Sequence, residues 1–193
     1  MITDNAPNKL APLADFAPRF GTVDEIIDAL IEMGSIRMVE PGMVELDHAL
    51  QCAAELKLIR PNDLELQVAG LVHDICHGRC HIRDHGEAGS EAVRDVFGTR
   101  VAELVRLHID AKRYLVAVDQ TYRSKLSAVS IETLALQGGG LSPGQIAAFE
   151  ASPYAEDACL LRIADEAAKV AGREVQGLET WIETLKSLAL TAQ

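Results

Sequence analysis

Apolar residues recur along this chain with the spacing of one helix face, and short breaks divide them into segments of helical length. No run of alternating apolar and polar residues extends beyond a few positions, so the pattern gives no support for a β-sheet. A chain made only of amphipathic helices must bury its apolar stripes by packing helix against helix. We therefore predict an all-α fold, a helical bundle of roughly seven helices.

Capping residues and breaks at glycine or proline place the expected helices. They are expected from Thr22 or Asp24 to Met33, over 44–58, 64–79, 85–98, 100–118 and 124–136, from Ser142-Pro143, over 156–170, and from Gly177 at the end of the chain. Residues 35–43 contain Pro41 and Gly42 and are expected to form a loop. The segment 64–79 is largely apolar as far as Cys76, so we expect it at the centre of the bundle.

The length of 193 residues, 48% of them hydrophobic, is enough to bury one sizeable core. We predict one domain over 1–193, preceded by a tail at 1–20. No window approaches the roughly 18 apolar residues that a membrane span needs. The first residues contain neither a basic leader nor an apolar run, so we expect a cytoplasmic protein.

The formal net charge of −11 argues against nucleic acid or an anionic membrane as a partner, because a polyanion needs a basic surface. Any anionic ligand would have to be bound by cations gathered at one place. A lysine or arginine next to a candidate site is therefore more informative here than it would be in a basic protein.

Ionisable residues interrupt several apolar segments of the chain. His48 lies in an apolar helical pattern, His73-Asp74 interrupts the most apolar one, and His108 follows the segment LVRL. A single such histidine is more often a satisfied core or surface residue. Burial of an imidazole or carboxylate is costly unless the group is paired or ligated, so several in different core segments suggest one shared partner. A metal ion is the simplest such partner.

A competing metal site would use Cys76, His77, Cys80 and His81. Structural zinc usually takes pairs of ligands from two separated elements, whereas these four residues crowd one helix end. The four cysteines of the chain are better interpreted as reduced thiols, because three lie in apolar helical patterns and no secretion signal accompanies them. They are Cys52, Cys76, Cys80 and Cys159.

The order of the ligand-type residues resembles the H...HD...D signature of the HD-domain superfamily. His48, His73-Asp74 and a distant Asp165 in LLRIADEAAKV carry the resemblance, which spans about Glu45 to Lys169. It implies an HD-type bundle with its catalytic core at about 44–170. Imidazole and carboxylate ligands suit iron, manganese or zinc, and a carboxylate can bridge two ions.

Two further histidines lie in the interval in which dinuclear HD domains carry additional ligands. These are His85 and His108, so the resemblance implies two metal ions. Without it, His85 would be interpreted as a loop or capping residue and His108 as a partly buried helix residue.

Five segments resemble a narrower group, the HD-domain mixed-valent diiron oxygenases of the PhnZ-like and TmpB-like kind, which cleave carbon–phosphorus bonds. The segments are ELDHALQCA, LVHDICH, HIDAKRYLV, LALQGGG and LRIADE, and the match covers most of the chain after residue 44. A generic phosphohydrolase requires neither AKRYL nor QGG. The resemblance implies an Fe(II)/Fe(III) pair that shares Asp74, dioxygen as co-substrate, and a small organophosphonate as substrate.

Two basic residues share the register of predicted metal ligands. Lys112 follows His108 by four residues and Arg162 precedes Asp165 by three, so each cation projects from the same helix face as a ligand. A phosphonate dianion could be held by Arg162 as a fork and by Lys112 as a point charge. The alternative for both is a solvated surface charge. We assign both to substrate binding, and Lys112 together with Asp74 to catalysis.

The resemblance adds further substrate contacts. His77, one turn after His73, resembles the phosphonate-contacting histidine of the family, and Ser130, Thr133 and Gln137 would add hydrogen bonds. Simpler interpretations exist: a histidine at a helix C-terminus for His77, a helix cap for Ser130, and a polar helix end for Gln137.

The loop before His48 departs from the family. The enzyme for the unmethylated amino substrate carries a tyrosine and a glutamate where this chain has Met38 and Pro41. A quaternary ammonium prefers apolar or aromatic walls with a carboxylate nearby, which Met38, Met43 and Glu40 could provide. We therefore expect 1-hydroxy-2-(trimethylammonio)ethylphosphonate, which would give glycine betaine and phosphate, ahead of the 2-amino analogue, which would give glycine.

Two other functions are compatible with the same ligand pattern. The first is a metal-dependent phosphohydrolase of the HD type, in which metal-bound hydroxide attacks phosphorus. The second is a non-catalytic HD-type sensor, although two cations in register with the ligands exceed what a scaffold needs. The sequence does not determine the oligomeric state.

Overall fold

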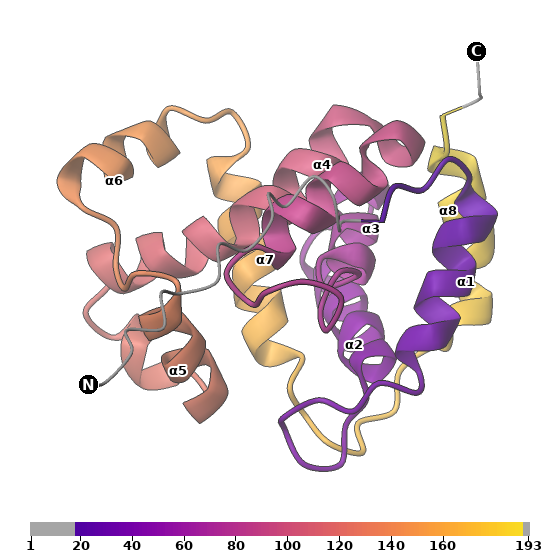
Figure 1. The fold of residues 1–193 in the computed structure, drawn as a ribbon, viewed down its shortest axis with the longest axis horizontal. Helices are drawn as coiled ribbons and strands as arrows, with labels where there is room; N and C mark the ends of the chain where they lie inside the picture. The colour runs from indigo at the N-terminus through magenta and orange to yellow at the C-terminus, as the bar shows by residue number, and fades with distance from the viewer. Residues whose placement is uncertain (1–17, 191–193) are drawn as a thin grey trace, which may run out of the picture.

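The computed structural model describes residues 18–190 and shows a bundle of helices (Figure 1). The helices are α1 Val23–Met33, α2 Glu45–Ile59, α3 Leu64–Val72, α4 His85–Val118, α5 Ala128–Leu136, α6 Pro143–Glu150, α7 Ala155–Ala167 and α8 Ile182–Leu188, with short 3-10 turns at Tyr122–Lys125 and Leu178–Thr180. Between residues 18 and 190 the only β-type pairing is an isolated bridge between Arg37 and Val44. The predicted all-α class is confirmed.

Sequence signals account for several of the helix ends. Thr22 caps α1 through a reciprocal pair of hydrogen bonds with Glu25, and Pro143 occupies the first turn of α6. Gly98 has φ 79° and interrupts α4, so residues 85–118 form two helical halves, as the predicted stop at Gly98 required. Residues 1–17 of the tail predicted at 1–20 lie outside the described residues. Within the described remainder of that tail, Phe20 is buried, and its N–H donates to the carbonyl of Ala92 in α4.

The expected helix over 64–79 is wrong beyond Val72. His73 Nδ1 donates to the carbonyl of Gly70 at 2.8 Å, at the C-terminal end of α3. After this point the N–H groups of Ile75, His77 and Arg79 bond to carbonyls three residues earlier, which describes tight turns. The HD dipeptide therefore lies at a helix end followed by turns.

The core is built where α3 meets its neighbours. Helices α2, α4 and α7 pack around α3 and against one another, and α1 and α8 cover one side of this group. In Figure 1, α5 and α6 lie at the opposite side of the molecule. Trp181 and Leu185 of the C-terminal segment are buried, so this segment closes the core next to α1. The four central helices are the ones that carry the predicted ligands or end beside them.

Helix α5 has a small apolar cluster of its own. Tyr122, Leu126 and Leu134 are buried there against Leu115 and Val116 of α4. The buried residues of α5 itself are one leucine and one serine. Apolar packing thus holds this helix less firmly than the central ones, and polar contacts described below carry more of its placement.

The close approach of α2 and α3 depends on Gly70. A Cβ atom added there would lie 2.4 Å from Leu56 Cδ1 and 3.3 Å from Cys52 Sγ, both side chains being fully buried. We expect Gly70→Ala to lower the free energy of unfolding by about 1–3 kcal/mol, because the added methyl overpacks this interface. Urea denaturation measures the change. Gly144→Ala is the matched control, since a Cβ there meets nothing within 4 Å; equal midpoints for the two variants would contradict the prediction.

Other expectations from the sequence can be compared directly. Cys52 and Cys76 are buried, Cys80 and Cys159 are half-buried, and all four are free thiols. No helix in the described part of the chain is long and apolar enough to cross a bilayer. The cytoplasmic location and the one-domain organisation stay predictions.

Candidate metal centre

Four histidines, from α2, the end of α3 and the two halves of α4, turn the same edge of their rings toward one another. In each, Nδ1 lies within hydrogen-bond distance of a backbone carbonyl, which can only accept, so Nδ1 carries the proton and Nε2 keeps its lone pair. The pairs are His48 with Ala168 at 3.2 Å, His73 with Gly70 at 2.8 Å, His85 with Ile82 at 2.7 Å, and His108 with Val105 at 2.6 Å. The backbone thus orients four Nε2 atoms as potential ligands.

These Nε2 atoms approach in two pairs. His48 Nε2 lies 3.3 Å from His73 Nε2, and His85 Nε2 lies 3.0 Å from His108 Nε2. Two lone pairs facing each other at such distances repel unless a cation lies between or beside them. The arrangement therefore fits two metal ions, one for each pair.

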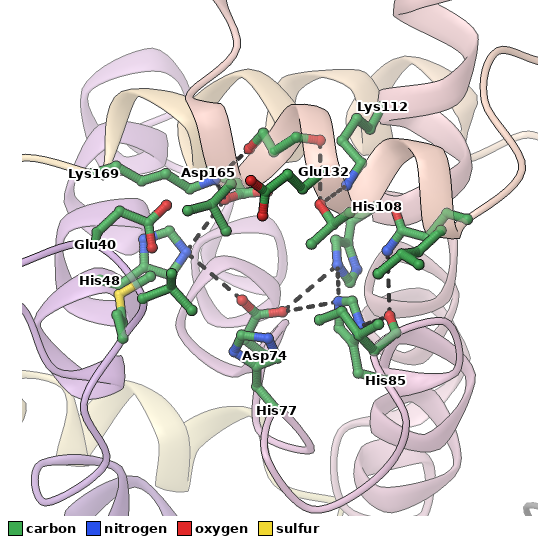
Figure 2. A pocket seen from close by; sticks show the side chains of 18 of the residues that line it. Glu40, His48, Asp74, His77, His85, His108, Lys112, Glu132, Asp165 and Lys169 are labelled. Atoms are coloured by element: carbon green, nitrogen blue, oxygen red, sulfur yellow. Dashed lines mark hydrogen bonds and ion pairs between the residues drawn. The ribbon is translucent and has the colours of Figure 1, made fainter.

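Asp74 lies between the two histidine pairs and offers one carboxylate oxygen to each. Figure 2 shows its carboxylate between His48 on one side and His85 and His108 on the other. Oδ2 is 3.4 Å from His73 Nε2 and 3.8 Å from His48 Nε2. Oδ1 is 3.3 Å from His85 Nε2 and 3.7 Å from His108 Nε2, and it is buried without a hydrogen-bond partner. An orphaned, buried carboxylate oxygen in this position fits a ligand that bridges two ions.

Asp165 completes the set on one side. Its Oδ1 lies 3.3 Å from His48 Nε2 and 3.9 Å from His73 Nε2. The first position would thus have two imidazoles and two carboxylates, and the second would have two imidazoles and the shared carboxylate. The structure brings all six predicted ligands together, and a nitrogen and oxygen donor set of this kind suits iron, manganese or zinc. Fewer protein ligands at the second position leave more room for exogenous ones.

The competing cysteine and histidine cluster does not form. Among residues 18–190, the groups able to hold an ion contain His48, His73, Asp74, His77, His85, His108 and Glu45, and none includes a cysteine. His81 is exposed, and its Nδ1 accepts from the backbone N–H of Arg83.

Burial keeps the ligand histidines neutral. It lowers the pKa of His73 to about 4 and the pKa values of His48 and His108 below the usual range, and the nearby Asp74 carboxylate only partly opposes this effect. A neutral imidazole is the form that binds a metal ion.

The lowered pKa of His73 predicts how the stability of the metal-free protein depends on pH. Because the folded-state pKa is below the ordinary 6.5, the imidazole of His73 is protonated in the unfolded chain at pH values at which it is still neutral in the folded protein. The free energy of unfolding is therefore unaffected by this residue above pH 6.5 and falls by roughly 3 kcal/mol as the pH is lowered toward about 4. Urea unfolding of metal-free protein between pH 7 and pH 4.5 tests this. His81→Gln should keep the wild-type slope and His73→Gln should flatten it; equal slopes in all three proteins would contradict the assignment.

A cavity of about 220 Å³ opens over the cluster. All the predicted site residues except His73 and Met43 line it, and Figure 2 shows side chains from the loop before α2, from α4, from α5 and from α7 converging on it. The predicted members of the lining are Met38, Glu40, His48, Asp74, His77, His85, His108, Lys112, Ser130, Thr133, Gln137, Arg162 and Asp165.

Lys112 is a buried cation with no counter-ion. Its side chain donates to Thr133 Oγ1 at 2.9 Å, and within residues 18–190 no carboxylate lies within ion-pair distance of its ammonium group. Burial, followed by the nearby charges of Arg162 and Lys169, lowers the pKa of Lys112 to about 7. A desolvated ammonium that lines a cavity above a metal centre is suited to an anionic ligand.

Arg162 differs from the free fork expected from the sequence. Its guanidinium pairs with Asp165 and with Glu166, and its Nε donates to the Tyr122 hydroxyl at 3.1 Å. The side chain is buried beside the cavity. Arg162 therefore orients a predicted metal ligand, in addition to contributing positive charge to the cavity wall.

His77 is held by a residue that the sequence did not single out. Its Nδ1 lies 2.8 Å from Oε1 of Glu45, a buried carboxylate in the first turn of α2. Burial lowers the pKa of His77, but the carboxylates of Glu45, Asp74 and Glu40 together outweigh it and raise the pKa to about 9. The ring is thus a cation with one N–H fixed on Glu45. Glu45 precedes His48 by three residues, so the register used for Arg162 would also have identified it.

The remaining predicted contacts lie on two walls. Gln137 Nε2 donates to the carbonyl of Ile82 at 3.3 Å, and its Oε1 is buried without a partner. Glu40 Oε1 is likewise buried and unsatisfied, and Met38 lies next to it in the lining. Met43 is buried in the core and does not line the cavity, so its expected part in the wall is wrong.

Three charged side chains near the cavity were not predicted. Lys169 and Glu132 line it, and Glu166 lies behind it, paired with Arg162 and Lys169. Lys169 follows Asp165 by four residues, so helical register applied to both sides of each ligand would have found it. Glu132 carries no such signal.

The HD domain family matches residues 46–168. A hydroxymethylphosphonate dioxygenase of Gimesia maris is 35% identical over 159 residues, which are 77% of this chain and 79% of that protein. A [1-hydroxy-2-(trimethylamino)ethyl]phosphonate dioxygenase (glycine-betaine-forming) of Leisingera caerulea is 37% identical over 120 residues, 57% of this chain and 61% of that one.

The family match covers all six ligand-type residues, and both relatives are named as dioxygenases of hydroxylated phosphonates. The resemblance inferred from the sequence is confirmed. The chain belongs to the HD-domain family and, within it, to the PhnZ-like oxygenases.

Proposed function

We propose that this protein is a diiron oxygenase that cleaves the carbon–phosphorus bond of a 1-hydroxyphosphonate, with the 2-trimethylammonio compound as favoured substrate. One substrate molecule and one dioxygen give a carboxylate and inorganic phosphate, with all atoms accounted for. The trimethylammonio substrate would give glycine betaine, and its 2-amino analogue would give glycine.

The observation that carries this proposal is the buried, unpaired ammonium of Lys112 beside two facing pairs of histidines. Lys169 and the cationic ring of His77 line the same cavity, so a phosphonate dianion would meet three cations besides the buried Arg162. In a chain of net charge −11 such a gathering is local and specific.

The residues of the centre have separable parts in this chemistry. Two iron ions held by His48, His73, Asp74, His85, His108 and Asp165 would supply the activation of dioxygen. Lys112 and His77 hold phosphonate oxygens and stabilise the charge that develops on the departing phosphate. Glu45 and Arg162 act indirectly, because Glu45 fixes the ring of His77 and Arg162 fixes the carboxylate of Asp165.

Two carboxylates near the cavity support a cationic substituent on the substrate. Glu40 presents a buried oxygen without a hydrogen-bond partner, and Glu132 also lines the cavity (Figure 2). Met38 and Leu136 add apolar surface. A trimethylammonium group, which donates no hydrogen bond, is suited to apolar walls with negative charge close by.

The test is a substrate panel on iron-loaded protein, with product identification. It contains hydroxymethylphosphonate and 1-hydroxy-2-aminoethylphosphonates with zero to three N-methyl groups. We expect phosphate release only with dioxygen present, and the highest kcat/KM with the trimethylated compound. Release that persists without dioxygen would instead indicate a phosphohydrolase. Manganese-loaded and zinc-loaded protein serve as metal controls and should be inactive.

The same panel tests Glu40. Glu40→Gln should reduce the preference for the trimethylated compound over hydroxymethylphosphonate by about tenfold, since one charge interaction near a partly buried site contributes on the order of 1 kcal/mol. An unchanged preference would remove Glu40 from substrate recognition. Higher activity of the wild type on hydroxymethylphosphonate than on any cationic substrate would reject the favoured substrate but keep the reaction.

A further inference from the structure

Glu166 connects two walls of the cavity although it does not line it. It lies on α7 next to the predicted ligand Asp165, and its side chain is only 12% exposed. Its carboxylate accepts hydrogen bonds from Arg162 Nη2, on α7, and from Lys169 Nζ, just after that helix. From α5 it accepts the backbone N–H of Ser127 and the hydroxyl of Ser130, the latter at 2.8 Å.

These contacts place the wall that α5 provides. Ser130 and Thr133 of α5 line the cavity, yet the apolar packing of this helix is confined to its own small cluster. Ser127 is the N-cap of α5, and its N–H is bonded to Glu166 while its hydroxyl accepts from Ser130 N–H. A nine-residue helix has little stability of its own, so such anchors decide where it lies.

Glu166 also controls repulsion among the cations of the cavity. Arg162 and Lys169 both pair with its carboxylate, Lys169 at 3.3 Å, so one negative charge lies between two of the cations. Its charge keeps Lys169 beside Ser130 Oγ, at 2.8 Å, next to the cavity.

We propose that Glu166 is a positioning residue for substrate binding, which fixes Arg162 and Lys169 on one wall of the cavity and the first turn of α5 on the other. The inference rests on the anion-binding part of the proposed function. It assigns a task to a carboxylate that touches neither the metal ligands' Nε2 atoms nor the cavity.

The test uses inorganic phosphate as the probe and metal-loaded protein, with binding measured by isothermal titration calorimetry. Glu166→Gln keeps the shape of the side chain but removes its charge. We expect its Kd for phosphate to rise by about tenfold or more, with metal content and the thermal midpoint close to wild type. In turnover assays KM should rise similarly while kcat changes less than about threefold. Glu166→Asp, which keeps the charge, should recover part of the affinity.

Glu55→Gln is the matched control, because Glu55 also pairs with an arginine, Arg173, but away from the cavity. It should leave the Kd unchanged. A wild-type Kd for phosphate in Glu166→Gln, combined with a lower thermal midpoint, would show that Glu166 only stabilises the fold and would overturn the proposal. Loss of metal from that variant would also overturn it. A second variant, Lys169→Met, should raise the Kd, and the double variant should show less than the sum of both effects.

Failure of this inference can be told apart from failure of the proposed function. Wild-type protein that binds phosphate but turns over no 1-hydroxyphosphonate would reject the proposed reaction and leave the comparison of Kd values valid. Wild-type protein that turns over substrate while Glu166→Gln binds phosphate normally would reject only the inference. Wild-type protein that binds no phosphate would overturn the inference, because Glu166 would then have no anion site to position.

Discussion

Asp74→Asn should remove at least one of the two metal ions and lower turnover by roughly a thousandfold, equivalent to about 4 kcal/mol of transition-state stabilisation. The reason is the position of this carboxylate, whose two oxygens lie 3.4 Å from His73 Nε2 and 3.3 Å from His85 Nε2. An asparagine keeps the shape but is neutral, and its amide nitrogen cannot bind an ion on the side that it occupies. Metal content by plasma emission spectroscopy and the low-temperature EPR signal of a mixed-valent pair measure the loss.

The metal-free form of this variant should fold, because Asp74 contributes an orphaned oxygen and four histidine contacts that are useful only when ions are bound. Circular dichroism of both metal-free proteins checks that point. Asp28→Asn, on the exposed face of α1, is the control and should keep full metal content. An Asp74→Asn protein with two ions per chain and near-normal turnover would contradict the bridging role.

Register along helices made most of the centre predictable. His48, His108 and Asp165 interrupt apolar helical patterns, and the structure places each in a helix that faces α3. The orientation of the His48 ring was not predictable, because it depends on the backbone carbonyl of Ala168, which is 120 positions away in sequence. Such long-range contacts leave no mark on local periodicity.

Apolar periodicity continues to Cys76 and predicts a longer helix, but α3 ends at Val72 and tight turns follow, in which the N–H groups of Ile75, His77 and Arg79 bond to carbonyls three residues earlier. A pattern of apolar residues does not distinguish such turns from the last turns of a helix. Glu166 was missed because the sequence indicates that it lies on α7 beside Asp165, but not that α5 folds back against it. Contacts between a central helix and a peripheral one are the least constrained by composition.

Lys112→Met should raise the KM for the phosphonate, and the Kd for inorganic phosphate, by about 10- to 100-fold while leaving metal content intact. Loss of a hydrogen bond to a charged group corresponds to roughly 1.5–3 kcal/mol. Methionine retains most of the length and apolar surface of the side chain, so the cavity wall persists. Lys186→Met, at an exposed position of α8, is the control and should bind like wild type. Loss of iron from Lys112→Met would show that Lys112 supports the cluster instead.

Stability gives an independent check on the same variant. Burial lowers the pKa of Lys112 to about 7, which means that the folded protein disfavours the ammonium relative to the unfolded chain between that pH and the ordinary 10.5. Removing the amine relieves this penalty, so metal-free Lys112→Met should be at least as stable as wild type at pH 7 in urea. A residue that serves ligand binding at a cost in stability should give this result when it is replaced: weaker phosphonate binding and undiminished stability. A structural lysine would instead lose stability and leave phosphate binding unchanged.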